Sequence, residues 1–306
     1  MKPKLIQDFI YPDLNEQNRQ YGASVLQAPV LNPTSDWRNI IPPFEEQLRN
    51  GVDSIACYIE AQQHAIASVH EKKFEEHDNN WSARFNALSS GTPSGGDPVK
   101  GADSIRNDGQ VEEYLMSYDG ITSWQEFHSW KGVDEARVRS AGKADLYLYD
   151  RHFGVVIQRE MPLETKYLIL REALKRSPVP MSLYGQTDFK GSYIQKPKGV
   201  YDTHMVVALY VSPDNQITVF DTYLPYIKVL PANYNPDYGM VWVVEKRPRM
   251  TATQRKSLLQ AILELLGLWK ADPVVIENVR KSVLNDFPSR TTLPPPPPSR
   301  TDLLKK

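Results

Sequence analysis

Apolar side chains recur at helical intervals in two well-separated parts of the chain. The stretch that starts at Tyr58 contains no Gly or Pro, and its apolar residues are spaced as on a helix, which predicts a helix over residues 55–74. Asp53 or Ser54, directly before it, would supply the N-cap oxygen. A second helix is expected over residues 164–175.

The second half of the chain has the pattern of antiparallel strands. Short runs rich in Val, Ile and Tyr alternate with turns made of Pro, Asn, Asp and Gly. The expected strands are 179–184, 205–211, 216–220, 227–230 and 240–244, with an earlier one near 146–158. In the first half, short helices are expected at 81–88 and 102–109, separated by a loop at 89–96. Helices followed by antiparallel strands predict an α+β fold.

The composition changes towards both ends of the chain. Residues 1–35 hold four prolines and show no sustained period, so we interpret them as an extended N-terminal arm. Residues 36–247 form the expected main domain. Residues 248–290 carry two C-terminal amphipathic helices, which are either docked core or a docking site for another chain. The Pro-rich tail, 291–306, is predicted to be a disordered spacer or an SH3-type ligand.

Charge and hydropathy argue against several kinds of partner. Lys and Arg number 36 and Asp and Glu number 37, so the basic excess typical of nucleic-acid binding is missing. No apolar run approaches the roughly 18 residues of a membrane span, and the N-terminus is not a signal peptide. His70-Glu71 and His77 do not form an H-E-x-x-H motif. We expect a cytoplasmic or virion-associated protein without nucleic acid, membrane, metal or cofactor.

Cys57 is the only cysteine, so it forms no intrachain disulfide and no multi-cysteine metal site. Its predicted place in the first turn of a helix favours the thiolate, because unpaired N–H groups and the positive end of the helix dipole stabilise negative charge. The alternative is a buried cysteine that acts as a small apolar side chain. A single cysteine without an export signal indicates a reducing setting.

The residues around Cys57 follow a characteristic order. Asp36-Trp37-Arg38 and Gln47 precede it, Ser54-Ile55-Ala56-Cys57-Tyr58 contains it, and His204 follows 147 positions later (204 − 57) at the start of a strand. This order resembles the papain-like cysteine peptidases. That family places its cysteine at a helix start in a C-G-[SA]-C-[WY] signature, with histidine and asparagine roughly 130–150 residues downstream. Asp221 lies where the family has the asparagine, and Tyr223 where it has the covering aromatic residue.

The resemblance implies a Cys-His-Asp triad. Cys57 would be the nucleophile, His204 its proton partner, and Asp221 the group that orients the ring. The backbone N–H of Cys57 and the side-chain amide of Gln47 would form the oxyanion hole. Gln47 lies ten residues before Cys57, which is longer than in the family, so a loop insertion has to be assumed and Asn50 is a substitute.

The resemblance also implies a substrate cleft between two lobes. Gly95 and Gly96 resemble the glycine pair beside the family's cleft, where the absence of Cβ lets a substrate backbone approach. Tyr58 and Tyr223 are expected beside the substrate. The cysteine would lie in a helical lobe, about 36–120, and the histidine and aspartate in a β-rich lobe, about 121–247.

The function that the resemblance implies is a cysteine endopeptidase that acts on a protein or on a peptidoglycan stem peptide, similar to bacteriophage and bacterial members of the family. Asp221 in place of asparagine leaves acyl transfer open as an alternative to hydrolysis, since transglutaminase-like relatives use Cys-His-Asp. Stem-peptide amidases usually carry Asp-Cys-Ser, which Ala56-Cys57-Tyr58 does not match. The alternative from another class is a non-catalytic virion or tail component, which would form homo- or hetero-oligomers through 1–35 and 251–290.

Overall fold

The computed structural model describes residues 5–6, 27–40, 46–77, 79–91, 95–188 and 192–247. Most of the expected N-terminal arm, the expected helices in 248–290 and the Pro-rich tail lie outside the described residues. The chain divides into one unit over Met1–Arg247 and a second over Pro248–Lys306. The described residues all belong to the first unit.

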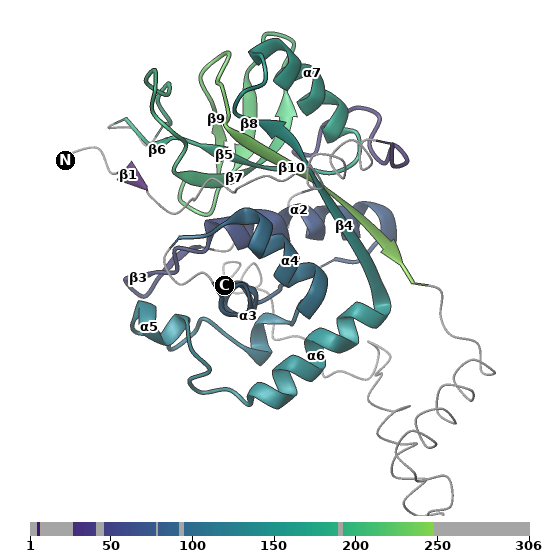
Figure 1. The fold of residues 1–306 in the computed structure, drawn as a ribbon, viewed down its shortest axis with the longest axis vertical. Helices are drawn as coiled ribbons and strands as arrows, with labels where there is room; N and C mark the ends of the chain where they lie inside the picture. The colour runs from purple at the N-terminus through teal and green to yellow at the C-terminus, as the bar shows by residue number, and fades with distance from the viewer. Residues whose placement is uncertain are drawn as a thin grey trace, which may run out of the picture. The chain divides into compact units, whose positions relative to one another are not determined.

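Six of the described strands form one antiparallel sheet in the order β4-β10-β5-β7-β8-β9 (Figure 1). These are β4 (Tyr149–Gln158), β5 (Val179–Leu183), β7 (His204–Val211), β8 (Ile217–Phe220), β9 (Ile227–Val229) and β10 (Tyr238–Lys246). The five strands expected in the second half of the chain are confirmed. β5, β7 and β8 lie inside the sheet and are buried along almost their whole length, so their continuous apolar runs are explained by cover on both faces.

Short strands form two further antiparallel pairs. β1 (Leu5–Ile6) pairs with β6 (Gly185–Gln186), and β2 (Leu48–Arg49) pairs with β3 (Val52–Asp53). The second pair is a tight hairpin whose turn, Asn50-Gly51, has positive φ at both residues, 51° and 78°. Asn-Gly is the preferred sequence for such a turn. This hairpin occupies the stretch directly before Cys57.

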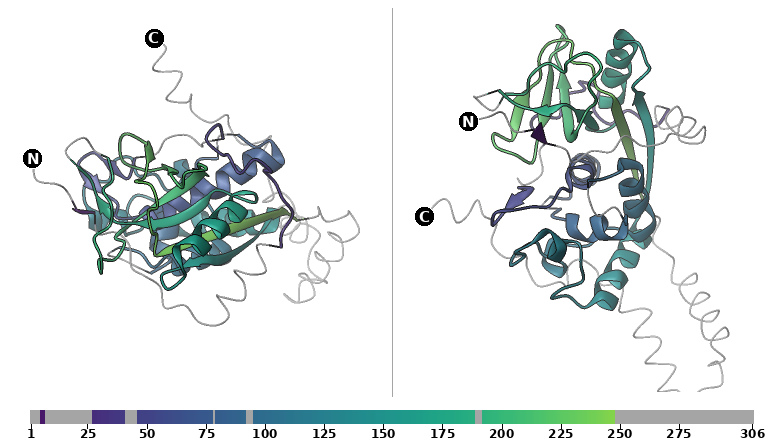
Figure 2. Two further views of the ribbon diagram at one scale, coloured as in Figure 1. Left: turned by 90° about the horizontal axis from the view of Figure 1, so that it is seen from above. Right: turned by 60° about the vertical axis from the view of Figure 1, so that its left-hand side comes forward.

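The helices other than α7 gather beside the sheet, as two views of the ribbon show (Figures 1 and 2). They are α2 (Cys57–Phe74), α3 (Ala83–Ser89), α4 (Pro98–Asp108), the 3-10 helix η1 (Glu113–Leu115), α5 (Trp124–Phe127) and α6 (Glu135–Leu148), while α7 (Leu163–Leu174) covers the sheet. The expected helices at 81–88, 102–109 and 164–175 are thereby confirmed. Within the described residues, no helix has both the length and the apolar character needed to cross a membrane.

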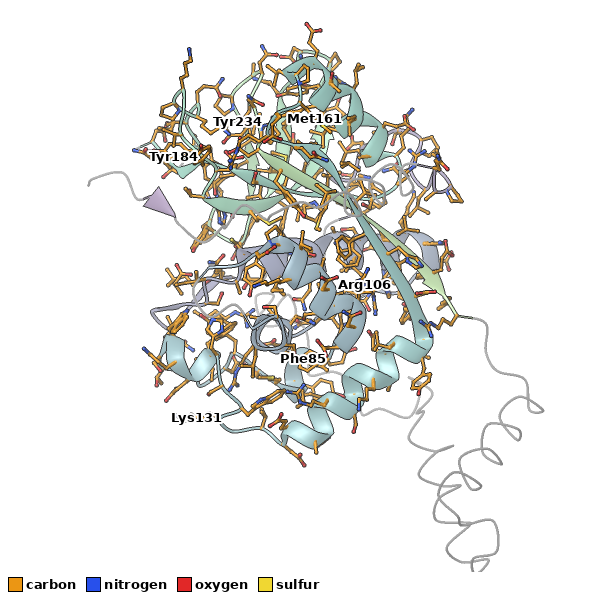
Figure 3. All side chains as sticks on the ribbon, viewed as in Figure 1. Phe85, Arg106, Lys131, Met161, Tyr184 and Tyr234 are labelled. Carbon is orange, nitrogen blue, oxygen red and sulfur yellow. The ribbon has the colours of Figure 1, made fainter. Side chains whose placement is uncertain are left out.

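A helix that the sequence did not predict, α6, follows the expected boundary between the lobes at residue 120. α6 packs against α4, and its Val138 joins Phe85, Val111 and Met116 in a small separate core (Figure 3 labels Phe85). α6 begins because the Asp134 side chain caps it by accepting from the Arg137 N–H at 3.1 Å. The strand expected from 146 therefore starts at 149, and the helical part of the unit extends to Leu148.

The start of α2 differs from the expected one. The helix begins at Cys57, its N-cap residue is Ala56, and no side chain caps it. Asp53 Oδ1 accepts from the Ile55 N–H at 3.1 Å, and Ser54 Oγ accepts from the Ala56 N–H at 3.3 Å. Both predicted caps are therefore wrong: these side chains bind one turn too early and stabilise the bend that leads into the helix. Cys57 is left at the first helical position.

α2 is buried around almost its entire circumference. Two of its glutamines donate to specific partners: the Gln62 amide donates to Tyr58 O and Pro98 O, and the Gln63 amide to Ser82 O and Asn86 Oδ1. Such bonds are required because an unpaired polar group in a core costs on the order of 1–3 kcal/mol. α2 is therefore the central element between the sheet and the remaining helices.

Trp37, in the Asp36-Trp37-Arg38 segment, connects the end of α7 to β7. Trp37 is fully buried, its indole N–H donates to Leu174 O at 2.6 Å, and its backbone N–H donates to Leu209 O at 3.0 Å. The tryptophan thus satisfies a carbonyl at the end of α7 and joins that end to β7. This contact gives the motif a packing role.

The Tyr58 ring fits against Gly96. A Cβ at Gly96 would lie 1.9–2.0 Å from ring atoms of Tyr58. We expect Gly96→Ala to lower the free energy of unfolding by about 3 kcal/mol, the upper range for overpacking, measured by denaturant titration. In a chain that already carries Tyr58→Ala, the same change should cost less than about 1 kcal/mol, because the clashing ring is gone. Equal costs in both backgrounds would contradict this packing.

His64, on α2, is buried against the Phe220 ring at a centroid distance of 4.7 Å. Burial, with a contribution from the Arg49 charge, lowers the pKa of His64 to about 3. The unfolded chain takes up this proton near pH 6.5. The folded chain does not, so the free energy of unfolding should fall by about 1.4 kcal/mol per pH unit between about pH 6 and 3.

This acid dependence can be measured by denaturant titration at pH 6.5 and pH 5. His64→Gln should lose about 2 kcal/mol less than the wild type between these two pH values. The matched control is His152→Gln, because the side chain of His152 is exposed. It should keep the wild-type dependence, and a wild-type dependence in His64→Gln would contradict the role given to burial.

Candidate active site

His204 and Asp221 meet where neighbouring strands deliver them. His204 is the first residue of β7 and Asp221 follows the last residue of β8, and these two strands pair. Nε2 of His204 lies 2.9 Å from Asp221 Oδ1, and both side chains are fully buried. Burial alone would raise the pKa of Asp221, but attraction to His204 and Lys228 lowers it to about 2. The carboxylate is therefore ionised over the whole physiological range.

Two further residues bind Asp221, and the sequence did not point to either of them. The Tyr193 hydroxyl donates to Oδ2 at 2.5 Å, and Lys228 Nζ donates to the same oxygen at 2.5 Å. Burial, followed by the charge of Asp221, raises the pKa of Tyr193 well above its usual range, so the phenol is a neutral donor. Lys228 brings a positive charge to this buried group.

Lys228 points inward, against its strand pattern. In Ile227-Lys228-Val229, alternation predicts two apolar residues inside and an exposed lysine. The structure has the reverse: Ile227 and Val229 are 40% and 52% exposed, and Lys228 is 7% exposed. An unpaired carboxylate in a core would cost more than the exposure of two apolar side chains on a short edge strand. The ion pair with the buried Asp221 carboxylate therefore explains why β9 buries Lys228 and exposes Ile227 and Val229.

Cys57 lies at the start of α2, which packs against β7. Burial is the main cause that raises the pKa of Tyr193, and electrostatic interactions with Asp221 and Cys57 add to it. The Tyr193 ring in turn lies 6.4 Å from the His204 ring. Among the described residues, Nδ1 of His204 has no hydrogen-bond partner. Asp221 thus holds only one of the two ring nitrogens.

Gln47 joins the segment before Cys57 to the turn after Asp221. Its amide Nε2 donates to Asp53 Oδ1 at 2.9 Å, and its Oε1 accepts from Thr222 Oγ1 at 3.2 Å. Its backbone N–H donates to Thr222 O at 3.3 Å, and its carbonyl accepts from the Ser54 N–H at 3.1 Å. Gln47 is buried, so its contacts fix the approach of the hairpin to the site.

The extra length between Gln47 and Cys57 is the hairpin of β2 and β3. Its Asn50-Gly51 turn is a strong sequence signal for a hairpin and would have located the insertion. Asn50, the substitute oxyanion donor, lies exposed in this turn. Of the two candidates, Gln47 is the one that contacts the residue next to Asp221.

The expected substrate-binding residues separate into two groups. The Tyr223 ring lies 5.5 Å from the His204 ring, and its hydroxyl donates to Asp53 Oδ2 at 2.7 Å, so it is the aromatic neighbour of the histidine. Tyr58 is fully buried, and its hydroxyl lies 3.0 Å from Ser90 Oγ. Its ring therefore offers no surface to a substrate. Gly95 and Gly96 are also buried, and Gly96 is required by the Tyr58 ring.

Comparison with known proteins identifies the fold. No family model and no curated protein sequence matches the chain. Among solved structures, the digestive procathepsin L 3 of Tenebrio molitor matches with a TM-score of 0.50 and 12% identity, over 78% of this chain and 75% of that one. Xylellain, a cysteine protease from Xylella fastidiosa, matches with a TM-score of 0.50 and 14% identity, over 81% of this chain and 99% of that one. The chain therefore has the papain-like, two-lobe α+β fold.

Proposed function

We propose that the protein is a cysteine peptidase that cleaves peptide bonds with Cys57, His204 and Asp221. The observation that carries the proposal is the arrangement of the His204 ring, with Nε2 held by a buried carboxylate at 2.9 Å and Nδ1 without a partner among the described residues. His70 pairs with Glu76 at 2.9 Å and likewise leaves one ring nitrogen unpartnered within the described residues, so the proposal depends equally on Cys57. The position of Cys57 at the start of a helix that packs on β7 supplies the nucleophile.

The proposed reaction proceeds in two steps. Cys57 transfers its proton to His204 and attacks the substrate carbonyl carbon, and the amine leaves with the proton from His204, so that a thioester remains. Water then attacks the thioester while His204 accepts its proton, and the thiolate leaves. Asp221 stabilises the imidazolium form and fixes the ring orientation throughout. A polypeptide is the substrate class that this chemistry needs, and an assembly role in a virion or tail stays a prediction.

The negative charge that develops on the carbonyl oxygen requires donors. The backbone N–H of Cys57 at the start of α2 is one, since the first helical N–H groups have no partner inside the helix. Gln47 would contribute its side-chain amide, whose nitrogen carries two N–H groups. Its contacts with Asp53 and Thr222 fix the position of this amide.

One observation favours the alternative of a non-catalytic scaffold. Cys57 and His204 are both 0% exposed, as expected of a cysteine that only fills the core. A peptidase must uncover this site before a substrate can reach the thiol. The two functions therefore differ in a measurable way, through the reactivity of Cys57.

Alkylation of Cys57 by iodoacetamide should distinguish the two functions. A thiolate paired with an imidazolium should react rapidly even at about pH 6, and His204→Ala should abolish this reaction at low pH. Mass spectrometry of the intact chain measures the rate without any substrate, because Cys57 is the only cysteine. A rate that rises only near the pH of an ordinary thiol, about 8.5, and ignores His204 would support the scaffold.

Gln47→Ala should reduce peptide cleavage by a factor on the order of 10²–10³, because an oxyanion donor is lost. The alkylation rate of Cys57 should stay within about twofold, since the thiolate does not depend on that donor. The matched control is Asp53→Ala, which removes the same Gln47–Asp53 hydrogen bond but keeps the amide. Equal losses in the two variants would show that Gln47 only stabilises the hairpin.

A further inference from the structure

Lys228 places a buried positive charge on the third member of the candidate triad. Its side chain is 5% exposed, and its Nζ donates to Asp221 Oδ2 at 2.5 Å and to Tyr223 O at 2.7 Å. β9 is the edge strand of the sheet, and its Lys228 is in register with Val219 of β8, two residues before Asp221. The ammonium group thus reaches across the strand pair to the side of the carboxylate that His204 does not occupy.

The two oxygens of Asp221 have different kinds of partners. Oδ1 faces His204 Nε2 at 2.9 Å and the backbone N–H of Tyr223 at 3.3 Å. Oδ2 faces the Tyr193 hydroxyl and Lys228. The Tyr193 phenol is neutral, because burial and the charge of Asp221 raise its pKa well above the usual range. Within the described residues, Lys228 is therefore the only lysine or arginine that binds this carboxylate.

Other titratable groups near the ring come from two further elements. Cys57 lies at the start of α2, which packs against β7. Asp53 approaches from β3 and accepts from the Tyr223 hydroxyl at 2.7 Å, with the Tyr223 ring between it and His204. A carboxyl group and a thiol are neutral or negatively charged, so neither can replace the ammonium of Lys228 in neutralising Asp221.

A carboxylate without this lysine would act strongly on His204. At a separation of a few ångströms in a buried site, an uncompensated negative charge typically raises the pKa of a neighbouring base by about one to three units. The imidazolium would then persist whether or not Cys57 is a thiolate. Proton exchange requires a ring that both accepts and releases its proton near neutral pH.

We propose that Lys228 cancels the charge of Asp221, so that His204 meets a hydrogen-bond acceptor without net charge, and that Lys228 thereby sets the pH range over which His204 exchanges its proton. An asparagine oxygen would offer the ring the same neutral acceptor. Lys228 is a positioning residue in this account, because it acts on the ring only through Asp221. The role of Lys228 in catalysis rests on the proposed function, whereas its effect on the charge at Asp221 does not.

The test is a histidine titration by nuclear magnetic resonance on the full chain with Cys57→Ala, which removes the thiol that would titrate together with the ring. Comparison with a His204→Gln chain assigns the signal. Adding Lys228→Met should raise the titration midpoint of the ring by about one pH unit or more. Adding Asp221→Asn as well should return the midpoint to within about 0.3 pH units of the Cys57→Ala parent, because both charges are then absent.

Lys196→Met is the matched control. Lys196 is also a lysine bound to carboxylates, at 2.9 Å from Asp202 Oδ1 and 2.7 Å from Asp237 Oδ1, and its side chain is only 9% exposed, but these partners lie outside the triad. Its loss should leave the midpoint unchanged. If Lys228→Met leaves the midpoint in place or lowers it, or if the double variant retains the rise, the charge balance is overturned.

Two complications have defined outcomes. If Lys228→Met does not fold, the Asp221→Asn, Lys228→Met chain still decides the question, since it should fold and keep the parental midpoint; a midpoint displaced by a unit would contradict the proposal. Failure of the peptidase proposal gives another pattern. Ordinary Cys57 alkylation together with a raised His204 midpoint would support the charge balance and reject the peptidase.

Discussion

The buried carboxylate of Asp221 is the constraint on which this structure depends. An ionised group cannot remain in a core unless charges and hydrogen bonds replace its water, because the loss of hydration costs several kcal/mol. Here a histidine, a tyrosine and a lysine supply them from three separate segments. Each of these segments is thereby fixed relative to the end of β8, and the candidate site and the sheet become parts of one network.

The helical side of the molecule also contacts the segment around Asp221. α2 presents Cys57 at its first position, and the β2–β3 hairpin before it is bound to the turn after Asp221 through Gln47 and Thr222. Tyr223, in that turn, binds Asp53 of the hairpin and packs beside the His204 ring. Polar contacts of the hairpin before Cys57 therefore join the lobe that carries the thiol to the turn that packs beside the imidazole.

The strands, the main helices and the papain-like fold could be predicted from periodicity and from residue order, since these depend on local alternation and spacing. The burial of Lys228 could not be predicted, because it depends on an ion pair with Asp221, which follows β8. The alternation of apolar and polar residues in β9 itself predicts an exposed lysine. The cap of α2 was misassigned because Asp53 and Ser54 bind the bend before the helix. α6 was missed since its apolar contacts belong to a small separate core. The local sequence pattern does not predict these three features, because each depends on contacts with residues outside the element or on a competing hydrogen bond.

The central claim is that Cys57 and His204 share a proton as a thiolate and an imidazolium. The most direct measurement is the ultraviolet absorbance of the thiolate in the full chain as a function of pH, as the difference between the wild type and Cys57→Ser. The account predicts thiolate absorbance already at pH 6, lost at this pH in His204→Gln. Absorbance that appears only as the pH rises through about 8.5, with or without His204, would contradict it.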